Sequence, residues 1–285
     1  MNKVAIIGFG AAGYNAAKEV RRLDPEAAID IYSDTESGPY NPMLTTYYVK
    51  EAIPYGALFP FGSLEAICTD LNLNYYGDRP VTGIIPQEKI LCFADGSRVQ
   101  YDQILISTGA SALMPPIPGL NQPGVFKMRT AEDAVQLKEM LDAGTIKSGL
   151  VIGASWVGIK VVEDLAERDI PCTLVDGADW MFYTAAFKET AERARKDLEA
   201  RGIGVHCAQM LERVEREPDG RLTAVMQSGS RFTADAVAVC IGVRMNVDFL
   251  RESGIAVKRG VLVNRRMEQI TKVYSRRATA VRRMS

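Results

Sequence analysis

The chain has 285 residues, of which 47% are hydrophobic and 24% charged, and its formal net charge is −1. This composition is typical of a folded globular protein and excludes a wholly disordered chain or a fibrous repeat. The nearly neutral charge gives no reason to expect nucleic acid as a partner. The sequence has no apolar run long enough to cross a bilayer, so we expect no membrane association.

The cysteines and the single histidine limit the chemistry. Five cysteines lie far apart with no C-x-x-C or C-x4-C pair, which favours free, mostly buried thiols and a cytoplasmic location. His206 is the one histidine, so a multi-histidine metal site is excluded and we expect no metal centre. His206 ends a strand-like stretch, where a structural role is favoured over a catalytic one.

The first 34 residues have the order strand, glycine turn, helix, strand. The apolar run at 3–7 predicts a strand covered on both faces, and the helix formers at 14–22 predict a helix. Between them lies the turn Gly8-Phe9-Gly10-Ala11-Ala12-Gly13. A second strand is predicted at 29–32, and Asp34 follows its end.

A glycine turn of this kind can bind the pyrophosphate of a dinucleotide through backbone N–H groups at a helix N-terminus. Gly8 permits the turn, Gly10 lets the backbone approach the phosphates, and Gly13 lets the helix pack closely on the strand. An acid about twenty residues further on can accept hydrogen bonds from ribose hydroxyls. The turn therefore predicts phosphate binding and not packing alone. The residues expected to contact this dinucleotide are Gly8, Gly10, Ala11, Ala12, Gly13 and Asp34, with Ser33 as an alternative to Asp34.

The same order returns 145 residues later. A strand at 150–152 leads into Gly153-Ala154-Ser155-Trp156-Val157-Gly158, a helix at 159–168 and a strand at 172–175, which Asp176 closes. Serine replaces the middle glycine, and its hydroxyl can donate to a phosphate. Asp176 repels a 2′-phosphate, which favours NADH over NADPH. The expected contacts are Gly153, Ser155, Trp156, Val157, Gly158 and Asp176, with Trp156 expected mainly to pack.

A further repeat supports a duplication. Residues 101–109 and 234–242 each place an aspartate before an apolar strand that ends in a glycine. Two strand–helix–strand units predict an α/β fold with two dinucleotide-binding units. The proline-rich stretch 114–119 marks a domain boundary, and a second crossing is expected near 243–247.

The two turns, Thr108-Gly109-Ala110 and the crossing at 116–119 together resemble the pyridine nucleotide–disulfide oxidoreductases and their relatives that reduce ferredoxin, rubredoxin or nitrite reductase centres. The resemblance implies two Rossmann-like, three-layer domains. A discontinuous FAD domain would comprise 1–116 and 245–285, and an NAD(P)H domain at 117–244 would be inserted in it.

The resemblance also assigns the cofactors. FAD is implied at the first turn, with Thr108, Gly109 and Ala110 nearby, and NADH at the second turn. Gly242 is implied to lie toward the nicotinamide. The implied reaction is hydride transfer from NADH to flavin, followed by electron release to an acceptor, with no side chain obliged to act as acid or base.

Several positions depart from the family pattern. Residues 38–47 resemble a P-Y-x-R-P-x-L-S-K segment that runs beside the flavin, but Asn41 replaces arginine, Thr46 replaces lysine, and the segment has no cysteine. A cysteine relay is therefore not expected. Lys160 replaces a glutamate that often follows the second turn; it is either a neighbour of the flavin or a surface lysine.

The resemblance leaves the acceptor open among a ferredoxin-, rubredoxin- or nitrite-reductase-like protein. Full-length members of the family are often dimers. The alternatives are an NADH oxidase or monooxygenase that uses oxygen, and a catalytically impaired nucleotide-binding fragment.

The end of the chain does not resemble the family. From Lys258 to Ser285 there are nine Lys or Arg against one acid, a charge of +8 that leaves −9 on the preceding residues. Family members continue with V-Y-A-A-G-D, which binds FAD, and a further domain, whereas here Val273-Tyr274 is followed by a basic ending. We expect a truncation by frameshift; a true short protein with a basic tail is the alternative, and a nucleic-acid-binding arm is less favoured.

Overall fold

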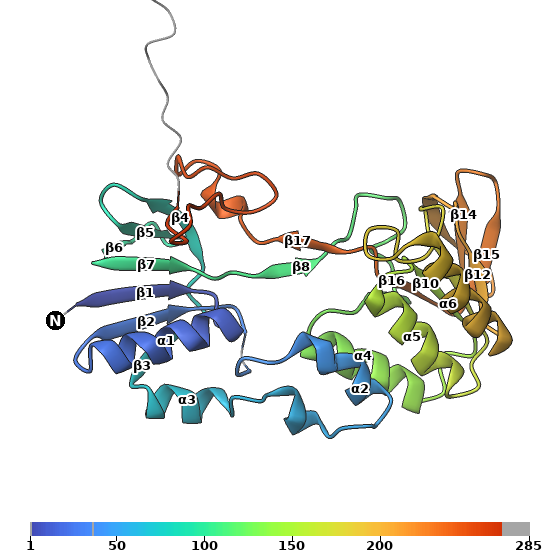
Figure 1. Ribbon diagram of the computed structural model, residues 1–285, viewed down its shortest axis with the longest axis horizontal. Coiled ribbons are helices and arrows are strands. Elements are labelled where there is room, and N and C mark those ends of the chain that lie inside the picture. Colours follow the sequence, from blue (N-terminus) through green and yellow to red (C-terminus); the bar gives the residue numbers. More distant parts are fainter. Residues whose placement is uncertain (1, 36, 270–285) are drawn as a thin grey trace, which may run out of the picture. The chain divides into compact units, whose positions relative to one another are not determined.

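The structure is a computed structural model that describes residues 2–35 and 37–269 (Figure 1). Val273, Tyr274 and the basic ending lie outside the described residues. The described chain forms two compact units: residues 2–39, 61–110 and 245–269 in the first, and 40–60 and 111–244 in the second. Residues 40–60 thus group with the second unit, whereas the resemblance places them in the FAD domain.

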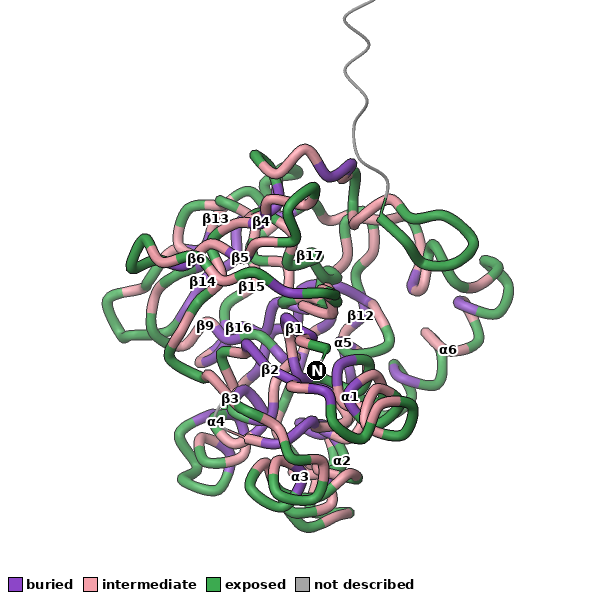
Figure 2. Tube along the Cα trace, turned by 90° about the vertical axis from the view of Figure 1, so that its left-hand side faces the viewer, coloured by how far each residue is buried: buried purple, intermediate pink, exposed green. Residues whose placement is uncertain are grey.

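The first unit is built on a parallel four-stranded sheet in the order β3-β2-β1-β7. Its strands are β1 (Lys3–Ile7), β2 (Ala28–Tyr32), β3 (Leu73–Tyr76) and β7 (Gln103–Ile106). Residues of β1 and β2 are almost all buried, as Figure 2 shows. The expected strands at 3–7 and 29–32 are therefore confirmed.

Opposite faces of this sheet pack against different elements, which makes three layers. Val4 and Ile6 share a core with Ala17 of helix α1 (Ala11–Leu23). Ala5 and Ile7 face a second core. That core includes residues of the antiparallel strands β4 (Val81–Ile85) and β5 (Ile90–Phe93), which β6 (Arg98–Gln100) extends. The first unit also contains α3 (Leu64–Asp70) and the 3-10 turn η3 (Asp248–Leu250).

The second unit repeats this plan with a parallel five-stranded sheet in the order β12-β11-β10-β16-β9. Its strands are β9 (Val125–Lys127), β10 (Gly149–Ile152), β11 (Cys172–Val175), β12 (Gly204–His206) and β16 (Ala236–Val239). Helices α4 (Ala131–Asp142), α5 (Trp156–Ala166) and α6 (Lys188–Ala200) belong to this unit, and Figure 1 shows them near the sheet. The α/β class with parallel sheets is confirmed.

The sheet of the second unit is also covered on both faces. Val151 and Leu174 pack in a core with residues of the three helices, such as Val161. Leu150 and Ile152 point the other way, into a core with the antiparallel sheet. That sheet contains β13 (Leu211–Arg216), β14 (Leu222–Met226) and β15 (Arg231–Ala234).

Residues 40–60 belong to the second unit because of what they bury. They form η1 (Pro42–Leu44), α2 (Thr45–Val49) and η2 (Tyr55–Leu58), and α2 contacts α4 and α5. Val49 is fully buried in the core that also contains Leu165. Its carbonyl accepts a hydrogen bond of 3.0 Å from the Arg168 guanidinium.

The chain passes between the units at two short strands that pair with each other. These are β8 (Ala110–Ala112) and β17 (Val243–Met245). Beside them, the Leu113 N–H donates to the Gly242 carbonyl at 2.9 Å. The second crossing falls in the expected stretch 243–247, whereas the first begins before the proline-rich stretch 114–119.

Candidate dinucleotide-binding sites

The first glycine turn connects β1 to α1 in a backbone conformation that requires glycine. Gly8 has φ 91°, and a Cβ there would lie 2.4 Å from the Ser107 carbonyl oxygen. A Cβ on Gly13 would lie 2.3 Å from the Gly8 oxygen, so the helix can approach the turn only with glycine at this position. The backbone conformation of Gly8 is thus the one that the turn requires, and Gly13 allows the close packing of the helix.

Gly10 differs from its neighbours because nothing lies within 4 Å of the place where its Cβ would be. It is the N-cap of α1, and no side chain caps the helix there. Ala11, Ala12 and Gly13 form the first helical turn, so α1 begins three residues before the predicted helix. The helix N-terminus thus offers backbone N–H groups beside open space, which suits an anion.

The other expected residues of the first site lie at the carboxyl ends of β2 and β7. Asp34 is exposed just past β2, and the Ser33 hydroxyl lies 3.3 Å from the Thr35 hydroxyl. The Thr108 hydroxyl donates to the Asn246 carbonyl at 2.6 Å, and Gly109 has φ 62°. Gly8, Asp34 and Thr108 therefore follow the carboxyl ends of three neighbouring parallel strands, where open α/β sheets bind ligands.

The second glycine turn repeats the geometry of the first between β10 and α5. Gly153 has φ 108°, and a Cβ there would lie 2.5 Å from the Cys240 carbonyl oxygen. A Cβ on Gly158 would lie 2.0 Å from the Gly153 oxygen. The outer two glycines of this turn are again fixed by close backbone approach.

Ser155 has a structural role that the motif does not reveal. Its hydroxyl accepts a hydrogen bond from the Gly158 N–H at 3.3 Å, which makes it the N-cap of α5. The same hydroxyl donates to the Cys240 carbonyl at 2.7 Å. Its proton is therefore already used, and the expected donation to a phosphate would require this bond to break.

Asp176 is held at the second turn by two backbone N–H groups. One carboxylate oxygen accepts from Ala154 at 2.5 Å and the other from Ala178 at 2.7 Å. Each oxygen keeps further capacity to accept a hydrogen bond. A fixed, half-buried negative charge at the turn favours ribose hydroxyls and disfavours a 2′-phosphate.

A pair of aromatic residues, one exposed and one half-buried, borders the second turn. Trp156 is 66% exposed, and its ring lies 4.1 Å from that of Phe182, a residue with φ 55°. Val157 is also exposed. Trp156 thus contacts Phe182 at the surface of the protein. The glycine motif does not identify Phe182 as a neighbour of the turn. The cluster of aromatic residues between 180 and 187 is the sequence feature that could have indicated it.

Three further expected site residues have local roles in the structure. The Lys160 ammonium pairs with the Glu163 carboxylate at 2.6 Å on the same helix, and this bond raises the pKa of Lys160. That arrangement is one of a surface lysine, and its role beside a flavin stays a prediction. Asn41 accepts from the Met43 N–H and caps η1, and Gly242 is exposed with φ 122°.

The thiols and acids of the described chain provide neither a disulfide relay nor a metal centre. The five cysteines are free, and burial raises the pKa of Cys172 to about 11 and that of Cys240 to about 12. Both thiols are therefore protonated and weakly reactive at neutral pH. Among residues 2–35 and 37–269, no group of three or more His, Cys, Asp or Glu is placed to hold a metal ion.

No helix in the described part of the chain is long and apolar enough to cross a membrane.

Two parallel α/β units, each with a glycine turn at a helix N-terminus, define a protein with two dinucleotide-binding folds of the Rossmann type. Comparison with known families agrees with this class. Residues 2–275 match the family described as pyridine nucleotide-disulphide oxidoreductase. The chain belongs to this family, which confirms the resemblance found in the sequence.

Individual relatives are oxidoreductases. The chain is 27% identical to an NADH oxidase of Methanocaldococcus jannaschii, over 96% of this chain and 62% of the relative. It is 26% identical to a rubredoxin-NAD(+) reductase of Acinetobacter baylyi, over 94% of this chain and 69% of the relative. The fold matches a water-forming NADH oxidase from Lactobacillus brevis bound to NADH, with TM-score 0.84, 23% identity, and coverage of 93% and 59%. The chain thus spans about 60% of the length of several relatives.

Proposed function

We propose that this protein is an FAD-dependent NADH oxidoreductase that binds FAD at the first glycine turn and NADH at the second. The observation on which this rests is the duplication of one geometry, in which each turn has two glycines whose Cβ atoms would clash with backbone. Membership of the family and the oxidoreductase names of relatives support it.

The first turn fits the pyrophosphate of FAD. The space beside Gly10 and the uncapped N-terminus of α1 let backbone N–H groups and the positive end of the helix dipole meet a phosphate. Asp34, or Ser33 in its place, would accept hydrogen bonds from ribose hydroxyls. When bound, FAD would accept a hydride from NADH and pass electrons on to an acceptor.

The second turn fits the adenosine half of NADH. Backbone N–H groups already fix both carboxylate oxygens of Asp176 at the turn. Ribose hydroxyls can therefore bind without a change in the orientation of this side chain. Repulsion of a 2′-phosphate by this carboxylate favours NADH over NADPH. Cys172 and Cys240 are buried and their pKa values are raised, so neither is suited to a thiol relay.

The electron acceptor is proposed to be a small redox protein of the rubredoxin or ferredoxin kind. The similarity to the A. baylyi rubredoxin-NAD(+) reductase supports this acceptor. Oxygen is the second candidate, which the NADH oxidase of M. jannaschii favours. The chain spans only part of these two relatives. Both candidate acceptors must therefore be assayed with this chain itself.

Binding of the two nucleotides tests the assignment. We expect FAD to give a yellow protein with the absorption of oxidised flavin, and NADH to bind with higher affinity than NADPH in calorimetry. Oxidation of bound, reduced flavin by rubredoxin, ferredoxin or air then identifies the acceptor. A colourless protein that binds NADH would favour the nucleotide-binding fragment, and a protein that binds neither nucleotide would refute the assignment.

A further inference from the structure

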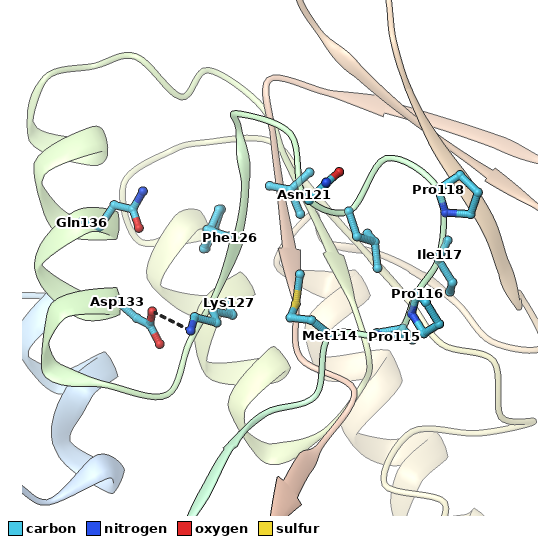
Figure 3. Close-up of a pocket in the computed structure, with 12 residues that line it drawn as sticks. Met114, Pro115, Pro116, Ile117, Pro118, Asn121, Phe126, Lys127, Asp133 and Gln136 are labelled. Carbon is cyan, nitrogen blue, oxygen red and sulfur yellow. Dashed lines mark ion pairs between the residues drawn. The ribbon is translucent and has the colours of Figure 1, made fainter. Parts of the chain in front are cut away.

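The second unit contains a cavity of about 620 Å³ away from the glycine turn. It lies beside the edge strand β9, between helix α4 and the proline-rich crossing (Figure 3). Its volume is in the range of small-molecule sites in proteins. Neither FAD nor NADH is assigned to this cavity, so its ligand is a separate question that does not rest on the proposed function.

One wall of the cavity is apolar and fixed in place. It is formed by the crossing, where Pro115, Pro116 and Pro118 restrict the backbone. The Pro118 carbonyl accepts a hydrogen bond of 2.9 Å from the Val214 N–H, which attaches the wall to β13. A rigid wall of proline rings offers a flat apolar group a surface that needs no ordering on binding.

The opposite wall is polar and is centred on Asp133. One of its carboxylate oxygens accepts from the N–H groups of Arg129 and Thr130, both at 2.9 Å, in a capping box at the start of α4. Its other oxygen lies 4.0 Å from the Lys127 ammonium. Gln136, one turn further along α4, lines the same wall.

The separation of Lys127 from Asp133 determines what the cavity can recognise. Lys127 and Asp133 both line the cavity, and Figure 3 shows their side chains pointing toward each other as an ion pair. The distance of 4.0 Å is longer than a hydrogen bond, so a ligand group could approach both charged groups. A carboxylate ligand would be attracted by Lys127 but repelled by Asp133. An ammonium ligand would be attracted by Asp133 but repelled by Lys127. A neutral group with an adjacent acceptor and donor satisfies both residues.

We propose that this cavity binds a neutral ligand with a flat apolar body and a primary amide, or an edge of the same hydrogen-bonding pattern. The ligand carbonyl accepts from the Lys127 ammonium, and the ligand N–H donates to the Asp133 oxygen that faces Lys127. The apolar body packs against Pro116 and Met114. The capping box fixes the Asp133 carboxylate before the ligand arrives.

Two probes of the same shape test this proposal, 2-naphthamide and 2-naphthoate. Calorimetry or ligand-observed NMR on the whole chain should show the amide binding about tenfold more tightly than the acid, because only the amide satisfies Asp133. Saturating NADH should leave the binding of the amide unchanged. Equal binding of both probes, or displacement of the amide by NADH, would overturn the proposal.

Substitutions then place the ligand. Lys127→Ala should weaken binding of the amide about tenfold. Asp133→Asn keeps an oxygen for the two backbone N–H groups but turns a donor toward the cavity, so the preference should change to the acid. Lys196→Ala, an exposed lysine on α6, is the matched control and should change nothing. Retention of the amide preference in both Lys127→Ala and Asp133→Asn would exclude this site.

Discussion

The carboxylate of Asp176 accepts a hydrogen bond from the backbone N–H of Ala154, 2.5 Å away and 22 residues earlier in the chain. This bond attaches the end of β11 to the glycine turn that follows β10. The acid expected to select the cofactor is therefore held at the turn itself. Its position depends on the turn and not on a flexible loop.

Asp176→Asn should weaken NADH binding about tenfold and narrow the preference for NADH over NADPH, because a charged acceptor for the ribose and the repulsion of a 2′-phosphate are both lost. Calorimetric titration with each nucleotide measures this. Asp179→Asn removes the same charge three residues later at an exposed position and is the control. An unchanged nucleotide preference in Asp176→Asn would remove Asp176 from the site.

Substitutions at two glycines of the first turn should distinguish an effect on FAD binding from an effect on stability. Gly10→Ala places a methyl group in open space, so the melting temperature should be retained while FAD affinity falls, since the methyl occupies the approach of the phosphate. Gly13→Ala forces a contact of 2.3 Å with the Gly8 carbonyl and should destabilise the unit by about 1–3 kcal/mol. Full FAD affinity in Gly10→Ala would mean that FAD does not approach this turn.

Ser155→Ala should lower stability by about 1 kcal/mol, because α5 loses its N-cap and the Cys240 carbonyl loses a donor. NADH affinity should change little if the hydroxyl remains bonded to Cys240 in the complex. Thermal unfolding and NADH titration of the same preparation check both statements. A large loss of NADH affinity at unchanged stability would instead assign the Ser155 hydroxyl to the phosphate.

Asp164 on α5 is expected to make stability depend on pH. It is 1% exposed, its oxygens have no hydrogen-bond partner among the described residues, and burial raises its pKa to about 8. Its charged neighbours, Lys50, Glu167, Glu163 and Lys160, shift the pKa less than burial does.

Because the folded state holds the Asp164 proton more tightly, the contribution of Asp164 to stability is most favourable below the pKa of an unfolded aspartate, about 4. This contribution should become less favourable as pH rises to about 8, by up to about 5 kcal/mol. Asp164→Asn should flatten this decline in urea unfolding curves measured between these pH values. Asp197→Asn, exposed on α6, should leave the decline as it is. A pH profile that Asp164→Asn does not alter would mean that another group causes the decline.

The local pattern of the sequence predicts the parts of the fold that repeat. Both glycine turns and the strand at 172–175 lie where the motif puts them, because apolar runs and glycines act through neighbouring residues. Helices α1 and α5 begin earlier than expected because residues of each turn form the first helical turn. The glycine motif alone therefore does not predict the residue at which each helix begins.

Contacts between distant residues escape the sequence pattern. Val49 is buried in the core of the second unit, against residues far away in the sequence. The local sequence of residues 40–60 does not predict this contact. Asp164 has the sequence context of a surface acid, and Ser155 that of a phosphate ligand. Their actual surroundings depend on which elements pack against α5, so only the folded chain reveals them.

Anaerobic addition of NADH to the FAD-reconstituted protein tests the central claim most directly. We predict that the absorption band of oxidised flavin disappears on addition of one equivalent of NADH, and that NADPH acts much more slowly. A flavin band that persists in the presence of saturating NADH would contradict the claim that this chain transfers a hydride between its two nucleotides.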